Sequence, residues 1–316
     1  MKIAMCDNNG GKFTTDLKEY WEKKGHEVKF ERGASESLAQ WCDLYYCDTF
    51  DNNIHYLYKH YHNEPGFDHP ADWDSNKKPL IVVRALDWEV WIGLARGQEL
   101  IDWVDKVIVI VPHIEDQLRK HAEFGDKIRV IRPGVNTDKF TLKESKTDGF
   151  QVGMALGDMW WPKNHMGGLD IFNQLSKKDK RWHLHIRGNH EGGTDYWKVM
   201  YDHYISSRGL EDRVTLYSHV PDMNQWYENI DYLLHPGMKE AFCYAVGEAM
   251  SKGIKPIVNE FYGSRDIWPD WSLYQDSSEA LKMFHHDQKP EFYRDYIKKT
   301  YPLSKQMEET DAYLGL

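Results

Sequence analysis

Two short apolar runs restrict the fold of this chain more than any other feature. PLIVVRAL (residues 79–86) and KVIVIVP (106–112) are almost continuous in apolar residues. A strand that is buried on both faces of a parallel sheet has this composition. Segments with helical periodicity separate these runs from further strand-like runs. Residues 1–146 are therefore expected to form an open parallel sheet with helices on both faces.

The same alternation begins again after the polar stretch TLKESKTDG (141–149), which is typical of a linker. Residues 150–290 are expected to form a second unit of the same kind. The last segment, 291–316, is amphipathic and helical, should kink at Pro302, and is expected to cross back onto the first domain. The predicted fold is α/β, with two Rossmann-like doubly wound domains that face a central cleft.

Composition excludes several other classes of protein. Four cysteines in 316 residues, none with the paired spacing of a zinc site, indicate free thiols in a reducing cytoplasm. No apolar run reaches the ~20 residues that span a bilayer, so no integral membrane segment is expected. The net charge of −10 argues against a nucleic-acid partner. The cysteines are Cys6, Cys42, Cys47 and Cys243.

Two glutamates in the second half, Glu240 and Glu248, carry the strongest chemical signal. On one straight helix they would lie about 12 Å apart along the axis. That exceeds the ~5–10 Å between the carboxylates of a glycoside hydrolase. We instead expect a helix that begins near Phe242, with free amides that bind a phosphate and with Glu248 binding a ribose diol. This arrangement predicts a site for a nucleotide-diphosphate sugar.

Several motifs, in order along the chain, resemble one enzyme family. PGMKEAFCYAVGEAM (236–250) resembles the E-x7-E signature of the family 4 retaining glycosyltransferases, which have the GT-B fold. Gly10-Gly11, KIRVIRPGVNTDKF (127–140) and GDMWWPKN (157–164) are similar to other motifs of that family. GHEV (25–28) is similar to the start of its second strand. The resemblance covers most of the chain.

The resemblance implies a role for each matching residue. Glu240 contacts the transferred sugar near the reacting carbon, Glu248 binds the ribose, and Lys163 holds the donor diphosphate. The implied site also includes the backbone amides of Phe242, Cys243 and Tyr244, and Gly11 of the first domain. The resemblance further implies a UDP- or GDP-sugar donor, a hydroxyl acceptor, retention of the anomeric configuration, and no required cofactor or metal.

Two positions depart from the family pattern. Asp158 stands where the family has a phosphate-binding arginine, and Arg187 either replaces that charge or forms a structural salt bridge. Leu86 stands where the family often has a histidine, so Asp87 or His113 is expected to take over its part in handling the acceptor. Both losses keep a second hypothesis open, in which the protein binds a nucleotide sugar without catalysis.

The acceptor is less well defined by the sequence. No basic amphipathic helix of the kind that rests on membranes is evident, so a saccharide or a small molecule is favoured. A hydroxymethylated DNA base, as used by phage-type enzymes of similar build, is the second choice.

Overall fold

A computed structural model describes the chain except for residues 9–10, 12–13, 51, 63, 67–72, 88–96, 159–160, 190–195, 218–219 and 286. The side chains of four further residues, Asp158, Asn189, Tyr196 and Trp197, are also left undescribed. The described chain divides into two compact units. The first comprises residues 1–133 and 304–316, and the second comprises residues 134–303.

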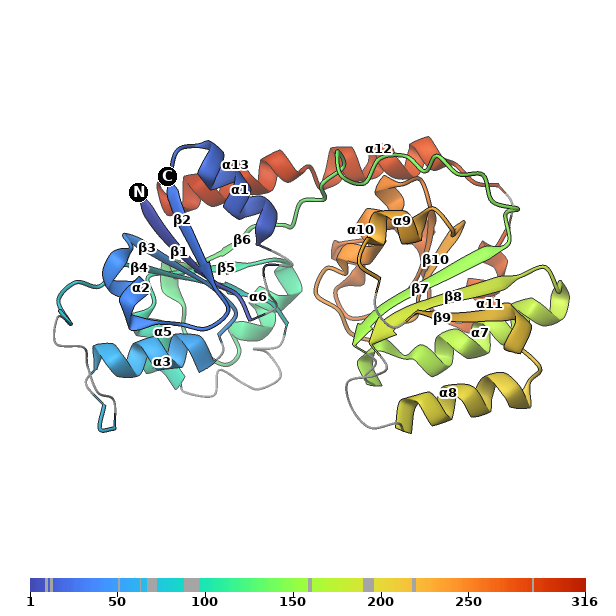
Figure 1. Ribbon diagram of the computed structural model, residues 1–316, viewed down its shortest axis with the longest axis horizontal. Coiled ribbons are helices and arrows are strands. Elements are labelled where there is room, and N and C mark those ends of the chain that lie inside the picture. Colours follow the sequence, from blue (N-terminus) through green and yellow to red (C-terminus); the bar gives the residue numbers. More distant parts are fainter. Residues whose placement is uncertain are drawn as a thin grey trace. The chain divides into compact units, whose positions relative to one another are not determined.

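The first unit contains a six-stranded parallel sheet with strand order β2-β1-β3-β4-β5-β6 (Figure 1). As predicted, β4 and β5 consist of the apolar runs and are almost wholly buried. The elements are β1 (Lys2–Cys6), α1 (Thr15–Lys23), β2 (Glu27–Glu31), α2 (Glu36–Trp41), β3 (Leu44–Asp48), α3 (Asn52–Tyr61), β4 (Leu80–Ala85), α5 (Gly97–Trp103), β5 (Lys106–Val109), α6 (Pro112–Leu118), β6 (Ile128–Val130) and α13 (Leu303–Leu314).

The second unit contains another six-stranded parallel sheet, with strand order β12-β11-β10-β7-β8-β9. The chain starts in the middle of this sheet at β7, moves outward to β9, and returns to β10 on the other side of β7. The elements are β7 (Gln151–Asp158), α7 (His165–Lys178), β8 (His183–Asn189), α8 (Tyr196–Ser207), β9 (Val214–Tyr217), α9 (Met223–Tyr227), β10 (Tyr232–His235), α10 (Tyr244–Ser251), β11 (Lys255–Asn259), β12 (Leu273–Tyr274), α11 (Ser277–Met283) and α12 (Pro290–Thr300).

The boundary between the units falls after Pro133, earlier in the chain than residue 146, because the intervening segment bonds to the second unit. The Arg294 guanidinium of α12 donates to the carbonyls of Thr137, at 2.9 Å, and of Phe140, at 2.7 Å. The amide of Ser145 donates to Glu228 Oε2 at 2.9 Å. These bonds hold residues 137–145 against the second unit.

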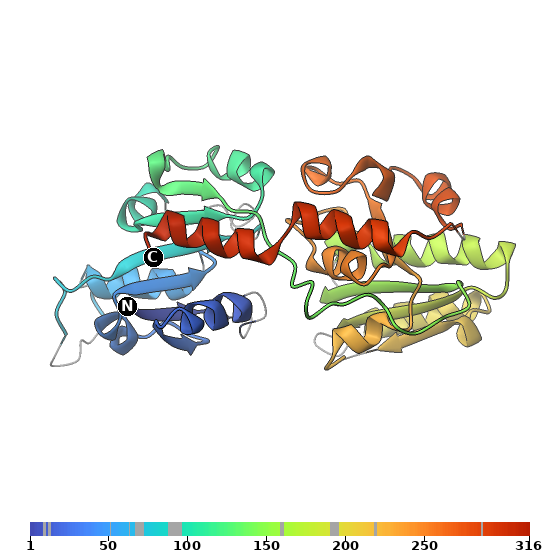
Figure 2. The ribbon, with the colours of Figure 1, turned by 90° about the horizontal axis from the view of Figure 1, so that it is seen from above.

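The C-terminal segment breaks where the sequence predicted a kink. Helix α12 ends at Thr300 and α13 begins at Leu303, and Pro302 lies between them. The helix breaks here because proline has no N–H and its ring obstructs the preceding turn. Helix α12 packs on the second unit and α13 on the first (Figure 2). Among the described residues, no helix is both long enough and apolar enough to cross a bilayer.

Candidate active site

The order of the second sheet reverses between β7 and β10, which are neighbours. In open α/β sheets, ligands bind at such a reversal, beyond the carboxyl ends of the strands. The loop after β7 contains Lys163, and the loop after β10 contains Glu240. The topology therefore brings these two predicted residues together, although 77 positions separate them in the chain.

Direct bonds connect these two loops. Lys163 Nζ lies 2.5 Å from Glu240 Oε1. The Asn164 side chain donates to the carbonyl of Pro236 at 3.1 Å, and the amide of Met238 donates to the carbonyl of Pro162 at 2.8 Å. The ion pair is therefore supported by two hydrogen bonds that involve the backbone.

The ion pair is only partly accessible to water. The Glu240 side chain is 10% exposed and the Lys163 side chain is 23% exposed. Burial by itself raises the pKa of the Glu240 carboxyl, but the polar contact with His235 and the charge of Lys163 lower it to about 2. Glu240 is therefore a fixed negative charge at neutral pH.

His235, the last residue of β10, is a site residue that the sequence analysis missed. Its ring is 3% exposed, and its Nε2 lies 3.4 Å from Glu240 Oε1. Its Nδ1 lies 3.5 Å from the Cys243 sulfur. Burial lowers the pKa of this imidazole, but the neighbouring Cys243 and Glu240 raise it above its usual range. The imidazole thus connects the strand end with both the loop and the helix.

Helix α10 begins beside this cluster. Its N-cap residue, Cys243, has a φ of +59°, and among the described side chains none caps the helix there. The Phe242 ring is buried against Trp268 and Tyr301, so only its backbone can contact a ligand. Tyr244 opens the helix and is half-buried. The positive end of the α10 dipole can attract an anion.

Glu248 lies one turn into α10 and is half-buried. The Tyr227 hydroxyl donates to Glu248 Oε2 at 2.8 Å. Burial raises the pKa of Tyr227 strongly, and the Glu248 carboxylate adds to this, whereas the charge of Arg187 acts in the opposite direction. Tyr227 was also missed from the sequence, because nothing in a lone tyrosine indicates its partner.

Arg187 lies in β8, close enough to Tyr227 for its charge to act on the hydroxyl. Within the described part of the chain, no carboxylate forms an ion pair with Arg187, and its buried Nε lacks a hydrogen-bond partner there. Arg187 therefore forms no structural salt bridge with a described residue. The side chain of Asp158, which replaces the expected arginine, is outside the described residues.

Packing against Val135 explains the glycine at position 247 of helix α10. A Cβ at this position would lie 2.7 Å from a methyl group of Val135, in the same unit.

The remaining predicted residues belong to the first unit. Gly11 follows β1 and has a φ of +85°, a conformation that favours glycine; Gly10 is outside the described residues. Asp87, half-buried, and His113, buried, follow β4 and β5 at the carboxyl edge of the sheet. At the same edge, Arg84 Nε lies 2.5 Å from Asp48 Oδ1 in a buried ion pair.

A comparison with known families matches most of the second unit. The sequence profile of the family described as glycosyl transferases group 1 matches residues 142–300, half of the chain. The chain belongs to this family. The protein is therefore a glycosyltransferase, an enzyme that transfers a sugar from a nucleotide-sugar donor. A search of curated proteins found no significant match.

Solved structures show that this glycosyltransferase has the GT-B fold. The Anabaena protein Alr3699/HepE, in complex with UDP and glucose, is 15% identical with a TM-score of 0.72 over 100% of this chain and 99% of that chain. The lipopolysaccharide outer core galactosyltransferase WaaB, in its apo form, is 19% identical with a TM-score of 0.66 over 100% and 99% of the two chains. A glycosyltransferase from Rickettsia africae is 12% identical with a TM-score of 0.70 over 99% and 98%.

Proposed function

We propose that this glycosyltransferase is a retaining enzyme of the family 4 type that transfers a hexosyl or related sugar from a UDP- or GDP-sugar to a hydroxyl group of a saccharide or small molecule. Glu240 contacts the transferred sugar, and Glu248 accepts hydrogen bonds from the ribose hydroxyls. Lys163, Arg187 and the amides of the Phe242–Tyr244 segment bind the diphosphate.

The observation that carries this proposal is the Lys163–Glu240 pair beside the N-terminus of α10, which no described side chain caps. The ammonium and the amides of α10 supply positive potential for a diphosphate, and the buried carboxylate next to them suits a sugar hydroxyl. Glu248, four residues beyond Tyr244, then lies farther along the same helix, as a ribose lies beyond the diphosphate of a nucleotide sugar.

In the proposed reaction, the C1–oxygen bond to the diphosphate breaks while the acceptor oxygen bonds to C1 on the same face. The departing phosphate oxygen accepts the acceptor's proton. Lys163, Arg187 and the helix dipole stabilise the negative charge that develops on this oxygen, so the proposal requires no metal. Gly11 and Asp87 of the first unit are assigned to the donor phosphate and to the acceptor, respectively.

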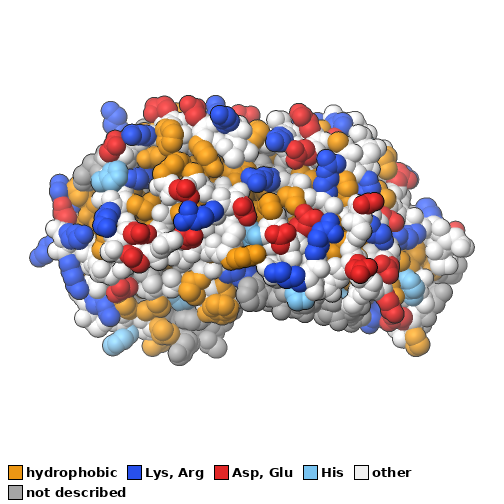
Figure 3. All heavy atoms as spheres, turned by 180° about the vertical axis from the view of Figure 1, so that it is seen from behind, with side chains coloured by type: hydrophobic (Ala, Val, Ile, Leu, Met, Phe, Trp, Pro, Cys, Tyr) orange, Lys and Arg blue, Asp and Glu red, His pale blue; other side chains and the backbone are white. Residues whose placement is uncertain are grey.

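The face in Figure 3 and the net charge favour a saccharide or small-molecule acceptor over DNA. On the face in Figure 3, basic and acidic side chains are interspersed, whereas a DNA-binding face concentrates basic ones. The net charge of −10 points the same way. The named contents of the HepE structures, UDP and UDP-glucose, support a UDP-sugar as the first donor to test.

The test is a panel of UDP- and GDP-sugars, with donor hydrolysis and sugar transfer measured in the presence of a chelator. We expect Glu248→Ala to weaken donor binding about 10²–10⁴-fold, because it removes two hydrogen bonds worth about 1.5–3 kcal/mol each. The exposed Glu291→Ala is the control and should bind normally. Unchanged donor affinity in Glu248→Ala would refute the assignment, and tight binding without any turnover would favour a non-catalytic binder.

A further inference from the structure

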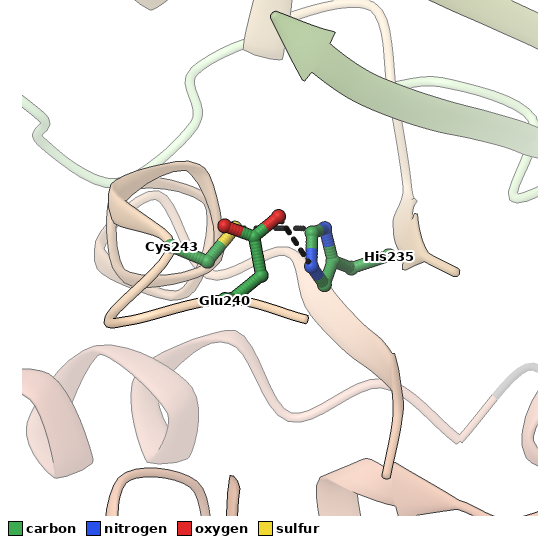
Figure 4. A group of neighbouring side chains, drawn as sticks. All are labelled: His235, Glu240 and Cys243. Carbon is green, nitrogen blue, oxygen red and sulfur yellow. Dashed lines mark hydrogen bonds and ion pairs between the residues drawn. The ribbon is translucent and has the colours of Figure 1, made fainter. Parts of the chain in front are cut away.

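Three metal-ligating side chains converge at the proposed sugar-binding end of the site (Figure 4). His235 comes from the end of β10, Glu240 from the following loop, and Cys243 from the N-cap of α10. One ligand atom from each residue lies within 4.8 Å of the other two. His235 and Glu240 are buried, and Cys243 is half-buried.

The spacing of the His235 and Glu240 ligand atoms fits a tetrahedral zinc ion. With bonds of about 2.0–2.1 Å to nitrogen and oxygen, two ligands of tetrahedral zinc lie about 3.4 Å apart. The distance between His235 Nε2 and Glu240 Oε1 is 3.4 Å. The Cys243 sulfur lies within 4.8 Å of the other two ligand atoms, and it must move inward to the spacing of about 3.5 Å that a zinc–thiolate bond of about 2.3 Å requires. A ligand set of imidazole, thiolate and carboxylate binds zinc in preference to magnesium or calcium.

The position between these atoms is kept free of side chain by Gly237. A Cβ on Gly237 would lie 2.8 Å from His235 Nε2 and 3.2 Å from Glu240 Oε1. The glycine therefore leaves space next to the two atoms that would bind the ion.

We propose that His235, Glu240 and Cys243 bind a zinc ion that inhibits the enzyme by withdrawing Glu240 from the sugar donor. The inhibitory part rests on the proposed function, in which Glu240 contacts the donor. The zinc ion is here an inhibitor and not a cofactor of the transfer. Its fourth ligand is water, because three protein ligands leave one tetrahedral position open.

Lys163 makes the proposal specific, because its ammonium lies 2.5 Å from Glu240 Oε1 and competes with a metal ion for this carboxylate. Zinc must displace this cation, and the Lys163 side chain is 23% exposed, so its ammonium can move towards water. Replacing Lys163 by methionine should therefore strengthen zinc binding several-fold while it weakens donor binding. A general loss of structure would weaken both.

The experiment measures zinc binding to the chelator-treated protein by competition with a chromophoric chelator, and then repeats it with cobalt as a spectroscopic probe. We expect one ion per chain and a thiolate-to-cobalt charge-transfer band. Cys243→Ala and Cys243→Gly should remove the band and weaken binding more than tenfold; the glycine variant accommodates the positive φ and so controls for misfolding. The buried thiol variant Cys42→Ala should bind as the wild type does.

Zinc binding with wild-type affinity in Cys243→Gly, or a stoichiometry well below one, would overturn the metal site. Turnover that is insensitive to zinc at saturation would overturn the inhibition. Donor turnover in chelator is measured separately, so its absence would refute the proposed function while the zinc and cobalt titrations still decide the metal site.

Discussion

Gly237→Ala tests whether the geometry around Glu240 is as tight as the structure shows. The added Cβ would lie 2.8 Å from His235 Nε2, against the 3.4 Å at which ordinary contact begins. It would also lie 3.2 Å from Glu240 Oε1. The methyl group therefore overlaps the imidazole by roughly 0.6 Å, and the buried ring at the end of β10 has little freedom to retreat.

Overpacking of this size costs about 1–3 kcal/mol of unfolding free energy. A loss of about 2 kcal/mol in a unit of this length lowers its thermal midpoint by about 4–8 °C. The displaced carboxylate also loses its alignment with Lys163. Donor affinity should consequently fall about tenfold or more, since small misplacements in a site are expensive.

The assay combines thermal unfolding with titration of the donor that the panel identifies. Gly33→Ala is the matched control, because its φ is not positive and a Cβ there meets nothing within 4 Å. It should change the unfolding free energy by less than about 0.5 kcal/mol. If Gly237→Ala matched this control in both stability and donor affinity, the described packing of His235 and Glu240 would be wrong.

Three further predictions concern other contacts. The pKa of Glu228 is lowered to about 2 despite burial, mainly by its bond with Lys252. The ionised Glu228 carboxylate therefore contributes fully to the unfolding free energy above about pH 4.5, and this contribution is lost as the pH falls towards 2. Glu228→Gln should cost about 2–3 kcal/mol at pH 7 and much less at pH 3, measured by urea unfolding; an equal cost at both pH values contradicts this. Tyr227→Phe should weaken donor binding about three- to tenfold in calorimetry by freeing the ribose-binding carboxylate, and unchanged affinity counts against that role. Asp311→Ala removes an acceptor at 2.8 Å from Trp21 Nε1, and should increase proteolysis of α13; wild-type resistance would argue against this anchor.

Much of the fold follows from the sequence because burial on both faces leaves a local signature. Strands β4 and β5 are visible in the sequence as apolar runs. The break at Pro302 follows from the missing N–H of this one proline. The family signature around Glu240 and Glu248 could also be found, since its spacing is local to one loop and one helix. Such features need no knowledge of long-range contacts.

Other features depend on contacts that the sequence does not encode locally. That Lys163 reaches Glu240 is fixed by the adjacency of β7 and β10. His235 and Tyr227 gave no signal, because an isolated histidine or tyrosine acquires its role only from the atoms packed against it. The sequence by itself thus determined the strands, helices and motif, whereas tertiary structure decided which charges meet, because parallel strands join distant segments at one edge of a sheet.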